Sequence, residues 1–155
     1  MKYSIQLSDA IHILAYIEIF KNTDWLSSDR IAKSVETNPA NIRKIMSQLR
    51  KSNLIITQAG KPTPTLAKPP EEISLLAIYK SIEGNTNLIQ VDPKTNPNCI
   101  VGANIQEVLS EKYTLLQRSI EKEMSEITLD SFIHEIAQLE IEKRPENRTI
   151  VDEYL

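Results

Sequence analysis

The stretch NPANIRKIMSQLRK, residues 38–51, decides the fold of this chain. Its apolar residues recur with the i, i+3, i+4, i+7 spacing of a single helix face, and they are Ile42, Ile45, Met46 and Leu49. Pro39 suits the first turn of such a helix, because the N–H that proline lacks would have no helical partner there. The other face is small, polar and cationic. The pattern therefore predicts a helix that buries one face and offers the other to a partner.

Two further helices are predicted before this stretch. Apolar residues at helical spacing indicate the first over about residues 7–21. Ser27 or Ser28 caps the second, which runs to about Glu36. Only residues 37–38 then separate the second helix from the third. A link this short between helices two and three is typical of the helix-turn-helix motif that reads DNA.

A β-hairpin is predicted after the third helix. Residues 54–57 are rich in branched side chains and read as a short strand, and residues 65–67 return as its partner. Pro62 and Pro64 restrict the returning strand to an edge, since proline cannot donate to a ladder. The order of three helices and a hairpin predicts a mainly α fold, with a winged helix-turn-helix DNA-binding domain over residues 1–70.

The second half of the chain predicts a helical linker and dimerisation region over residues 71–140, followed by a polar, loosely held tail over residues 141–155. A helix from Ser74 to near Gly84 and a loop over 85–100 precede a long helix from Val101 to about Glu126. At about 1.5 Å per residue this helix is ~38 Å long, more than a small domain needs for its own core. We expect a second copy of the chain to cover its surplus apolar stripe. The stripe consists of Ile105, Val108, Leu109, Leu116, Ile120 and Met124.

Composition and charge narrow the function. The chain has 155 residues, a single cysteine and a net charge of −3. No apolar run approaches the ~18 residues of a membrane span, and the lone cysteine excludes an intrachain disulfide, so we expect a cytoplasmic protein. Between Thr37 and Pro70 there are six basic residues and no acidic one. This window indicates a local polyanion site, the alternative being a solvated basic surface.

The residues expected to contact DNA lie mostly on the polar face of the third helix. Side chains in the first half of a recognition helix reach base edges, where arginine can pair with guanine and asparagine with adenine. A helix N-terminus suits a phosphate oxygen, and outlying lysines add attraction that weakens with salt. For each lysine the alternative is a solvated side chain. The candidates are Ser28, Asn38, Asn41, Arg43, Lys44, Ser47, Lys51 and Lys61.

Four segments of the chain resemble a known family. They are MKYSIQLSDAIHILAYI, NIRKIMSQLRKSNLI, AKPPEEISLLAIYKSIEG and NPNCIVGANIQEVL, which begin at residues 1, 41, 67 and 96. In this order, over roughly residues 1–135, the sequence is similar to the bacterial Rrf-type winged-helix regulators, the family of IscR, NsrR and CymR. The resemblance implies a homodimer that binds a palindromic operator and usually represses transcription, with the long helix as the dimer interface.

The chain departs from the family pattern at two places. Members with an iron–sulfur cluster hold it through three closely spaced cysteines before the long helix, whereas this chain has only Cys99 there. Cluster ligation normally needs several thiolates, so we expect no cluster and no other metal. The wing has GKPTPTLAK in place of a glycine-rich turn with an aromatic residue, a difference that speaks against minor-groove insertion by the wing. The chain thus falls in a branch without the cluster-binding cysteines.

Cys99 has two interpretations. Near a helix N-terminus a thiol can react as thiolate, which would allow redox sensing. Otherwise it is a small buried packing residue. No pattern identifies the effector or signal.

Other function classes have less support. No catalytic triad, phosphate loop or paired carboxylate is recognisable, so we expect no enzyme. A winged-helix protein-interaction module that does not bind DNA is the alternative, favoured by the overall acidity and the unusual wing.

Overall fold

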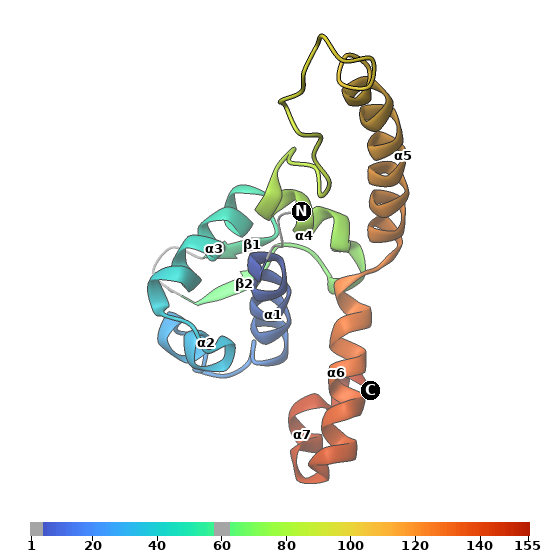
Figure 1. Cartoon of the computed structure of the whole chain (residues 1–155). Helices are drawn as coiled ribbons and strands as arrows, with labels where there is room; N and C mark the ends of the chain where they lie inside the picture. Colours follow the sequence, from blue (N-terminus) through green and yellow to red (C-terminus); the bar gives the residue numbers. More distant parts are fainter. Residues whose placement is uncertain (1–4, 58–62) are drawn as a thin grey trace.

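The computed structural model describes residues 5–57 and 63–155, which form a helical head and a projecting arm (Figure 1). The helices are α1 (Ile5–Ile19), α2 (Ser28–Val35), α3 (Pro39–Lys51), α4 (Leu75–Glu83), α5 (Ile105–Glu126), α6 (Leu129–Lys143) and α7 (Arg148–Val151). Strands β1 (Ile55–Thr57) and β2 (Pro64–Leu66) form a hairpin, and the 3-10 turns are η1 (Pro70–Glu72), η2 (Pro145–Asn147) and η3 (Asp152–Tyr154). We call α1–α4 with the hairpin the head, and residues 85–126 the arm. The mainly α winged helix-turn-helix fold is confirmed.

The hairpin follows the rule for proline in strands. β1 and β2 pair antiparallel, with Ile55 opposite Leu66 and Thr57 opposite Pro64. The returning strand begins one residue earlier than the sequence predicts, at Pro64. Proline fits there because the missing N–H falls at the first position of a two-stranded sheet.

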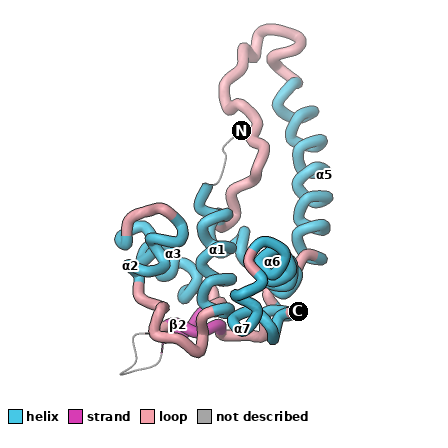
Figure 2. The backbone as a smooth tube through the Cα atoms, turned by 90° about the horizontal axis from the view of Figure 1, so that it is seen from below, coloured by secondary structure: helices cyan, strands magenta, loops and turns pink. Residues whose placement is uncertain are grey.

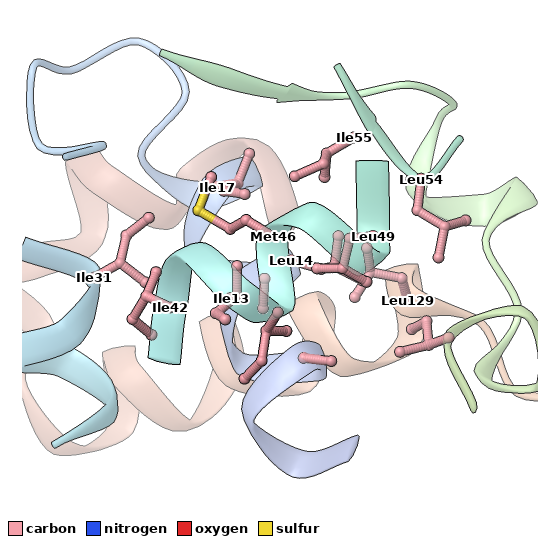
Figure 3. Packing of buried hydrophobic residues seen from close by; sticks show 14 of the residues in the cluster. Ile13, Leu14, Ile17, Ile31, Ile42, Met46, Leu49, Leu54, Ile55 and Leu129 are labelled. Atoms are coloured by element: carbon pink, nitrogen blue, oxygen red, sulfur yellow. The ribbon is translucent and has the colours of Figure 1, made fainter. Parts of the chain in front are cut away.

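The core of the head is built from the face that the opening stretch predicts (Figure 3). Ile42, Ile45 and Leu49 are fully buried and Met46 nearly so, which confirms the stripe on α3. They pack in one cluster with side chains from α1, β1 and α6, among them Ile13, Leu14, Ile17, Ile55, Leu129 and Ile133. Burying each aliphatic side chain contributes roughly 1.5–3 kcal/mol relative to leaving it exposed.

Helix α6 therefore belongs to the core of the head, although it follows the arm in sequence. A short antiparallel bridge between Ser74 and Thr128 joins the starts of α4 and α6. Leu75 N donates to Ile127 O at 2.7 Å, and Leu129 N donates to Ile73 O at 2.8 Å. Because Ser74 and Thr128 are also the N-caps of these two helices, the bridge fixes where both begin.

The arm is different. α5 has 22 residues, of which only Gln117 is buried, and it projects beside the ascending loop (Figures 1 and 2). The helix starts at Ile105, so the predicted start at Val101 is wrong. Residues 101–104 form turns instead, in which the Thr95 hydroxyl donates to Gly102 O at 2.8 Å. A Cβ at Gly102 would collide with the carbonyl of Asn96, so this close approach requires glycine.

The C-terminal residues are folded, contrary to the loosely held tail that their polarity predicts. Val151 is buried, and the Tyr154 hydroxyl donates to Glu18 O on α1 at 2.8 Å. His134 Nδ1 lies 2.8 Å from Tyr154 O, which ties the last turn back to α6. Figure 2 shows α6 and α7 beside α1. The few apolar residues of this segment suffice because α1 and α6 supply the surface against which they pack. Within the described part of the chain, no helix has the length and apolar character needed to cross a membrane.

Candidate nucleic-acid interface

The turn between α2 and α3 sets the orientation of the candidate recognition helix. Glu36 ends α2 in the left-handed region at φ 60°, where a non-glycine residue is uncommon. Thr37 N donates to Ala32 O at 3.0 Å, and Asn38 then caps α3. Pro39 occupies the first turn as predicted. This turn lets α3 bury its apolar face while Arg43 and Lys44 remain exposed; α3 itself lies on the side of the head away from α5 (Figure 1).

The polar face of α3 carries unneutralised positive charge. We call its exposed cations the cationic face: Arg43, Lys44, Arg50 and Lys51. No ion pair to any of them occurs within residues 5–57 and 63–155. Ser47 lies among them and is half-buried. An exposed cationic surface without acidic partners attracts a polyanion, and its charges are not satisfied internally.

Arg50 was missed by the sequence reasoning. It is exposed and lies seven residues after Arg43, so the two fall on the same side of α3. The same spacing relates Lys51 to Lys44. The i+7 relation alone was the signal that could have found Arg50.

Asn38 and Asn41, both predicted to contact DNA, already form hydrogen bonds at the start of α3. Asn38 Oδ1 accepts from Asn41 N at 2.8 Å. Asn41 Nδ2 donates to Thr37 Oγ1 at 3.2 Å. Bidentate reading of adenine uses both atoms of an asparagine amide, so it would have to share or replace these hydrogen bonds. The cap thus accounts for both asparagines, and Arg43 and Lys44 are the better-placed candidates for base contacts.

The N-terminus of α2 offers a second place for a phosphate, although Asp29 lies in its first turn. Ser27, not Ser28, is the cap, with its hydroxyl accepting from Arg30 N at 3.3 Å. Ser28 is half-buried in the first turn, where backbone amides favour an anion. Arg30, which the sequence reasoning missed, lies over the Trp25 ring at 5.7 Å from its centroid. Such stacking leaves the guanidinium edge available for phosphate.

The remaining predicted contacts are peripheral or lie outside the described residues. Lys51 is exposed in the last turn of α3. Lys61 falls in the wing segment that the structure does not describe. The structure thus brings Arg43, Lys44, Ser47 and Lys51 together on a single helix, with Ser28 on the neighbouring one.

The predicted dimer stripe divides into two groups. Val108 and Leu116 are each 47% exposed, and Leu115, which was not predicted, is 65% exposed. Ile105, Leu109, Ile120 and Met124 are half-buried. Large apolar side chains exposed along one helix mark an interaction surface more often than a solvated one.

A buried polar hub joins the arm to the head. Gln117 of α5 accepts from Leu88 N at 3.1 Å, and its amide nitrogen lies 3.5 Å from the Tyr79 hydroxyl of α4. Tyr79 in turn donates to Thr86 O at 2.7 Å. A second link is the ion pair between Lys80 and Glu121, which lowers the pKa of Glu121. The loop, α4 and α5 thus share hydrogen bonds at one point.

Cys99 is exposed, so its interpretation as a buried packing residue is wrong. Hydrogen bonding by the backbone of Gly102 and Val101 lowers the pKa of its thiol, because amide donors stabilise the thiolate. A single thiolate does not fit an iron–sulfur cluster. Among the described residues there is also no group of three or more His, Cys, Asp or Glu side chains that could hold a metal.

Comparison with known proteins finds relatives over most of the chain. The family model described as "Rrf2: Iron-dependent Transcriptional regulator" matches residues 3–135. The chain is 37% identical over 131 residues to YwnA of Bacillus subtilis (strain 168), which is named as an HTH-type transcriptional regulator. The matched region covers 84% of this chain and 96% of YwnA.

Two solved structures show the same fold. A regulator from Lactobacillus plantarum has a TM-score of 0.72 at 21% identity and covers 94% of this chain and 98% of its own. CymR, described as the global cysteine regulator of B. subtilis, has a TM-score of 0.61 at 18% identity and covers 86% and 96%. Because the sequence identities are this low, the two structures support a shared fold and nothing further.

Proposed function

We propose that this chain, which belongs to the Rrf2 family of transcriptional regulators, binds a palindromic operator as a homodimer and represses transcription. The family makes it a regulator and not an enzyme. The observation that carries the proposal is the cationic face of α3, exposed and without acidic partners in the described residues.

The contacts follow from the helix geometry. Arg43 and Lys44 lie in the first half of α3, where a recognition helix meets base edges. Ser28 and Arg30 at the start of α2, with Lys51 at the end of α3, would contact phosphates on either side. Phosphate contacts fix the register, while Arg43 and Lys44 supply the sequence preference.

Homodimerisation would place two such heads on one duplex. A palindromic site presents its half-sites about 34 Å apart, one turn of the double helix. The exposed apolar residues of α5, Val108, Leu115 and Leu116, support a second copy as the partner of the arm. Because α3 and α5 lie on opposite sides of the head, the arm can pair without covering the cationic face (Figure 1).

We propose that a signal acts through the arm without a resident iron–sulfur cluster, since the thiolate set does not fit one. The loop 85–100 carries Cys99, which is the candidate point of oxidation. The polar hub at Tyr79 and Gln117 would pass a change in the loop to α4 and so shift the angle between the two heads. Such a signal shifts a population of head orientations that already exists.

Binding to DNA at two salt concentrations tests the proposal. Wild type should bind a random duplex with steep salt dependence, because each neutralised phosphate releases counterions. The double variant Arg30→Gln and Lys51→Gln removes two of the proposed phosphate contacts, so it should weaken binding and flatten the salt slope by about 2. Lys143→Gln, an exposed cation at the end of α6 without an ion pair among the described residues, is the control and should leave both unchanged.

The result also separates the two function classes. Absence of salt-dependent binding by the wild type would overturn DNA binding and support the protein-interaction module. If the wild type does bind DNA, selection of bound fragments from genomic DNA would identify the operator and show whether it is palindromic.

A further inference from the structure

A groove of about 670 Å³ lies between the head and the C-terminal helices. One wall is α1 with the segment that follows it, and the other is α6 and α7. This volume falls within the roughly 300–1,000 Å³ of small-molecule sites. The groove is separate from the cationic face of α3, none of whose residues line it. Its features indicate what could occupy it.

The first wall is aromatic. The rings of Tyr16 and Phe20 lie 4.5 Å apart between centroids at 45°, and those of Phe20 and Trp25 lie 5.4 Å apart at 44°. The Tyr16 hydroxyl donates to Trp25 O at 2.9 Å, which holds the cluster together. Fixed, tilted rings offer both faces and edges to a planar aromatic guest.

The opposite wall is aliphatic and unusually open to solvent. Ile136 of α6 is 43% exposed and Ile150 of α7 is 39% exposed, while Trp25 across the groove is 39% exposed. Three large apolar side chains thus face a shared space without covering one another. Filling that space would remove apolar surface from water on both walls.

The polar groups at the rim carry no net charge. Glu140 is paired with Arg144, whose Nε lies 2.7 Å from Glu140 Oε1, and Asn147 Nδ2 donates to the same oxygen at 2.6 Å. His12 Nε2 lies 2.7 Å from Ser34 Oγ, and desolvation lowers the pKa of His12, so it is neutral at pH 7. Among the residues that line the groove, a charged guest would find no unpaired opposite charge, whereas a hydroxyl could join His12 and Ser34.

We propose that this groove binds a small, uncharged, planar aromatic molecule that carries a hydroxyl group. The rings stack against Tyr16, Phe20 and Trp25, and the hydroxyl meets the pair formed by His12 and Ser34. The ligand bridges α1 and α2 to α6 and α7, so it restrains α7 and the end of α6 against the DNA-binding head. This last consequence for operator binding rests on the proposed function, whereas the site itself does not.

The test uses 2-naphthol as the probe and Trp25 as the reporter. Trp25 is the single tryptophan of the chain and lines the groove, so its indole N–H gives one resonance in a nitrogen-15 spectrum. At neutral pH, 2-naphthol should shift this resonance saturably with one site per chain. The anion 2-naphthoate should bind about tenfold more weakly, because its charge would be buried without a partner.

A pair of variants locates the site. Ile136→Glu places a charge in the groove and should weaken 2-naphthol binding by about tenfold. Leu139→Glu is the matched control, since Leu139 lies on the same helix, is 49% exposed and does not line the groove. It should bind as the wild type does.

Several results would overturn the proposal. They are a Trp25 resonance that does not respond, equal binding of 2-naphthoate, equal loss in both variants, and binding abolished at high protein concentration because a second copy covers the groove. The assay contains no DNA, so a failure here is distinct from a failure of operator binding.

Discussion

The head and the arm use similar side chains to opposite effect. In the head, the aliphatic residues of α3 that face inward are buried almost completely, as Ile42 and Leu49 are at 0% exposure. In the arm, Leu115 and Leu116 of α5 remain largely in water. Both helices carry an apolar stripe, so the stripe alone does not say what will cover it. In the head the chain covers its own stripe, and in the arm it leaves the stripe exposed.

The largest effect is expected for a truncation in the core of the head. Leu49→Ala should lower the free energy of unfolding by about 3 kcal/mol, because it removes buried methyl groups and leaves a cavity. Leu139→Ala, a truncation of the same type at an exposed position of α6, should cost less than about 0.5 kcal/mol. Urea unfolding followed by circular dichroism measures both. Equal losses in the two variants would show that the head is not packed as described.

A smaller effect is expected at the proposed dimer interface of the arm. Leu116→Glu puts a charge on the exposed stripe of α5 and should weaken self-association by at least about tenfold, since the charge would be buried between copies. Thr114→Glu, exposed on another side of α5, is the control. Sedimentation over a concentration series measures the monomer–dimer equilibrium. A monomeric wild type, or an unchanged equilibrium in Leu116→Glu, would contradict the dimer.

The smallest effect concerns the tip of the arm. Cys99 should reach half its maximal rate of alkylation by iodoacetamide below the ordinary thiol pKa of about 8.5, because nearby amides stabilise the thiolate. The stabilisation is present above the ordinary thiol pKa and is lost as pH falls through the lowered value. The urea-unfolded chain is the control and should titrate normally.

Replacing the same cysteine tests whether it senses the proposed signal. Oxidant should change operator affinity in the wild type and leave Cys99→Ser unaffected. If the variant responds as the wild type does, the signal acts elsewhere, and the alkylation profile reports a local property only.

The sequence predicted those parts of the molecule in which neighbours along the chain determine the structure. The stripe on α3 and the first-turn Pro39 depend on residues within one or two helical turns, and both are present. The predicted start of α5 failed, because Thr95 and Asn96 approach Gly102 across the loop. The predicted tail failed too, because Tyr154 reaches Glu18 across 136 residues.

The candidate site shows the same division. Arg43 and Lys44 could be predicted as exposed, since their position on α3 follows from its period and no acid lies near them in sequence. The engagement of Asn38 and Asn41 in the cap requires actual hydrogen bonds, and the stacking of Arg30 on Trp25 depends on how a connecting segment folds back. Such contacts leave little trace in the periodicity of the sequence.

By itself, then, the sequence determined the order of elements, the buried face of α3 and the membership of a regulator family. Only the tertiary structure decided that α6 completes the core of the head, that Gln117 meets Tyr79, and that an aromatic groove opens beside α1. The reason is physical: helix period and capping are set by local backbone geometry. Burial, hubs and grooves depend on surfaces that meet only after distant segments have packed.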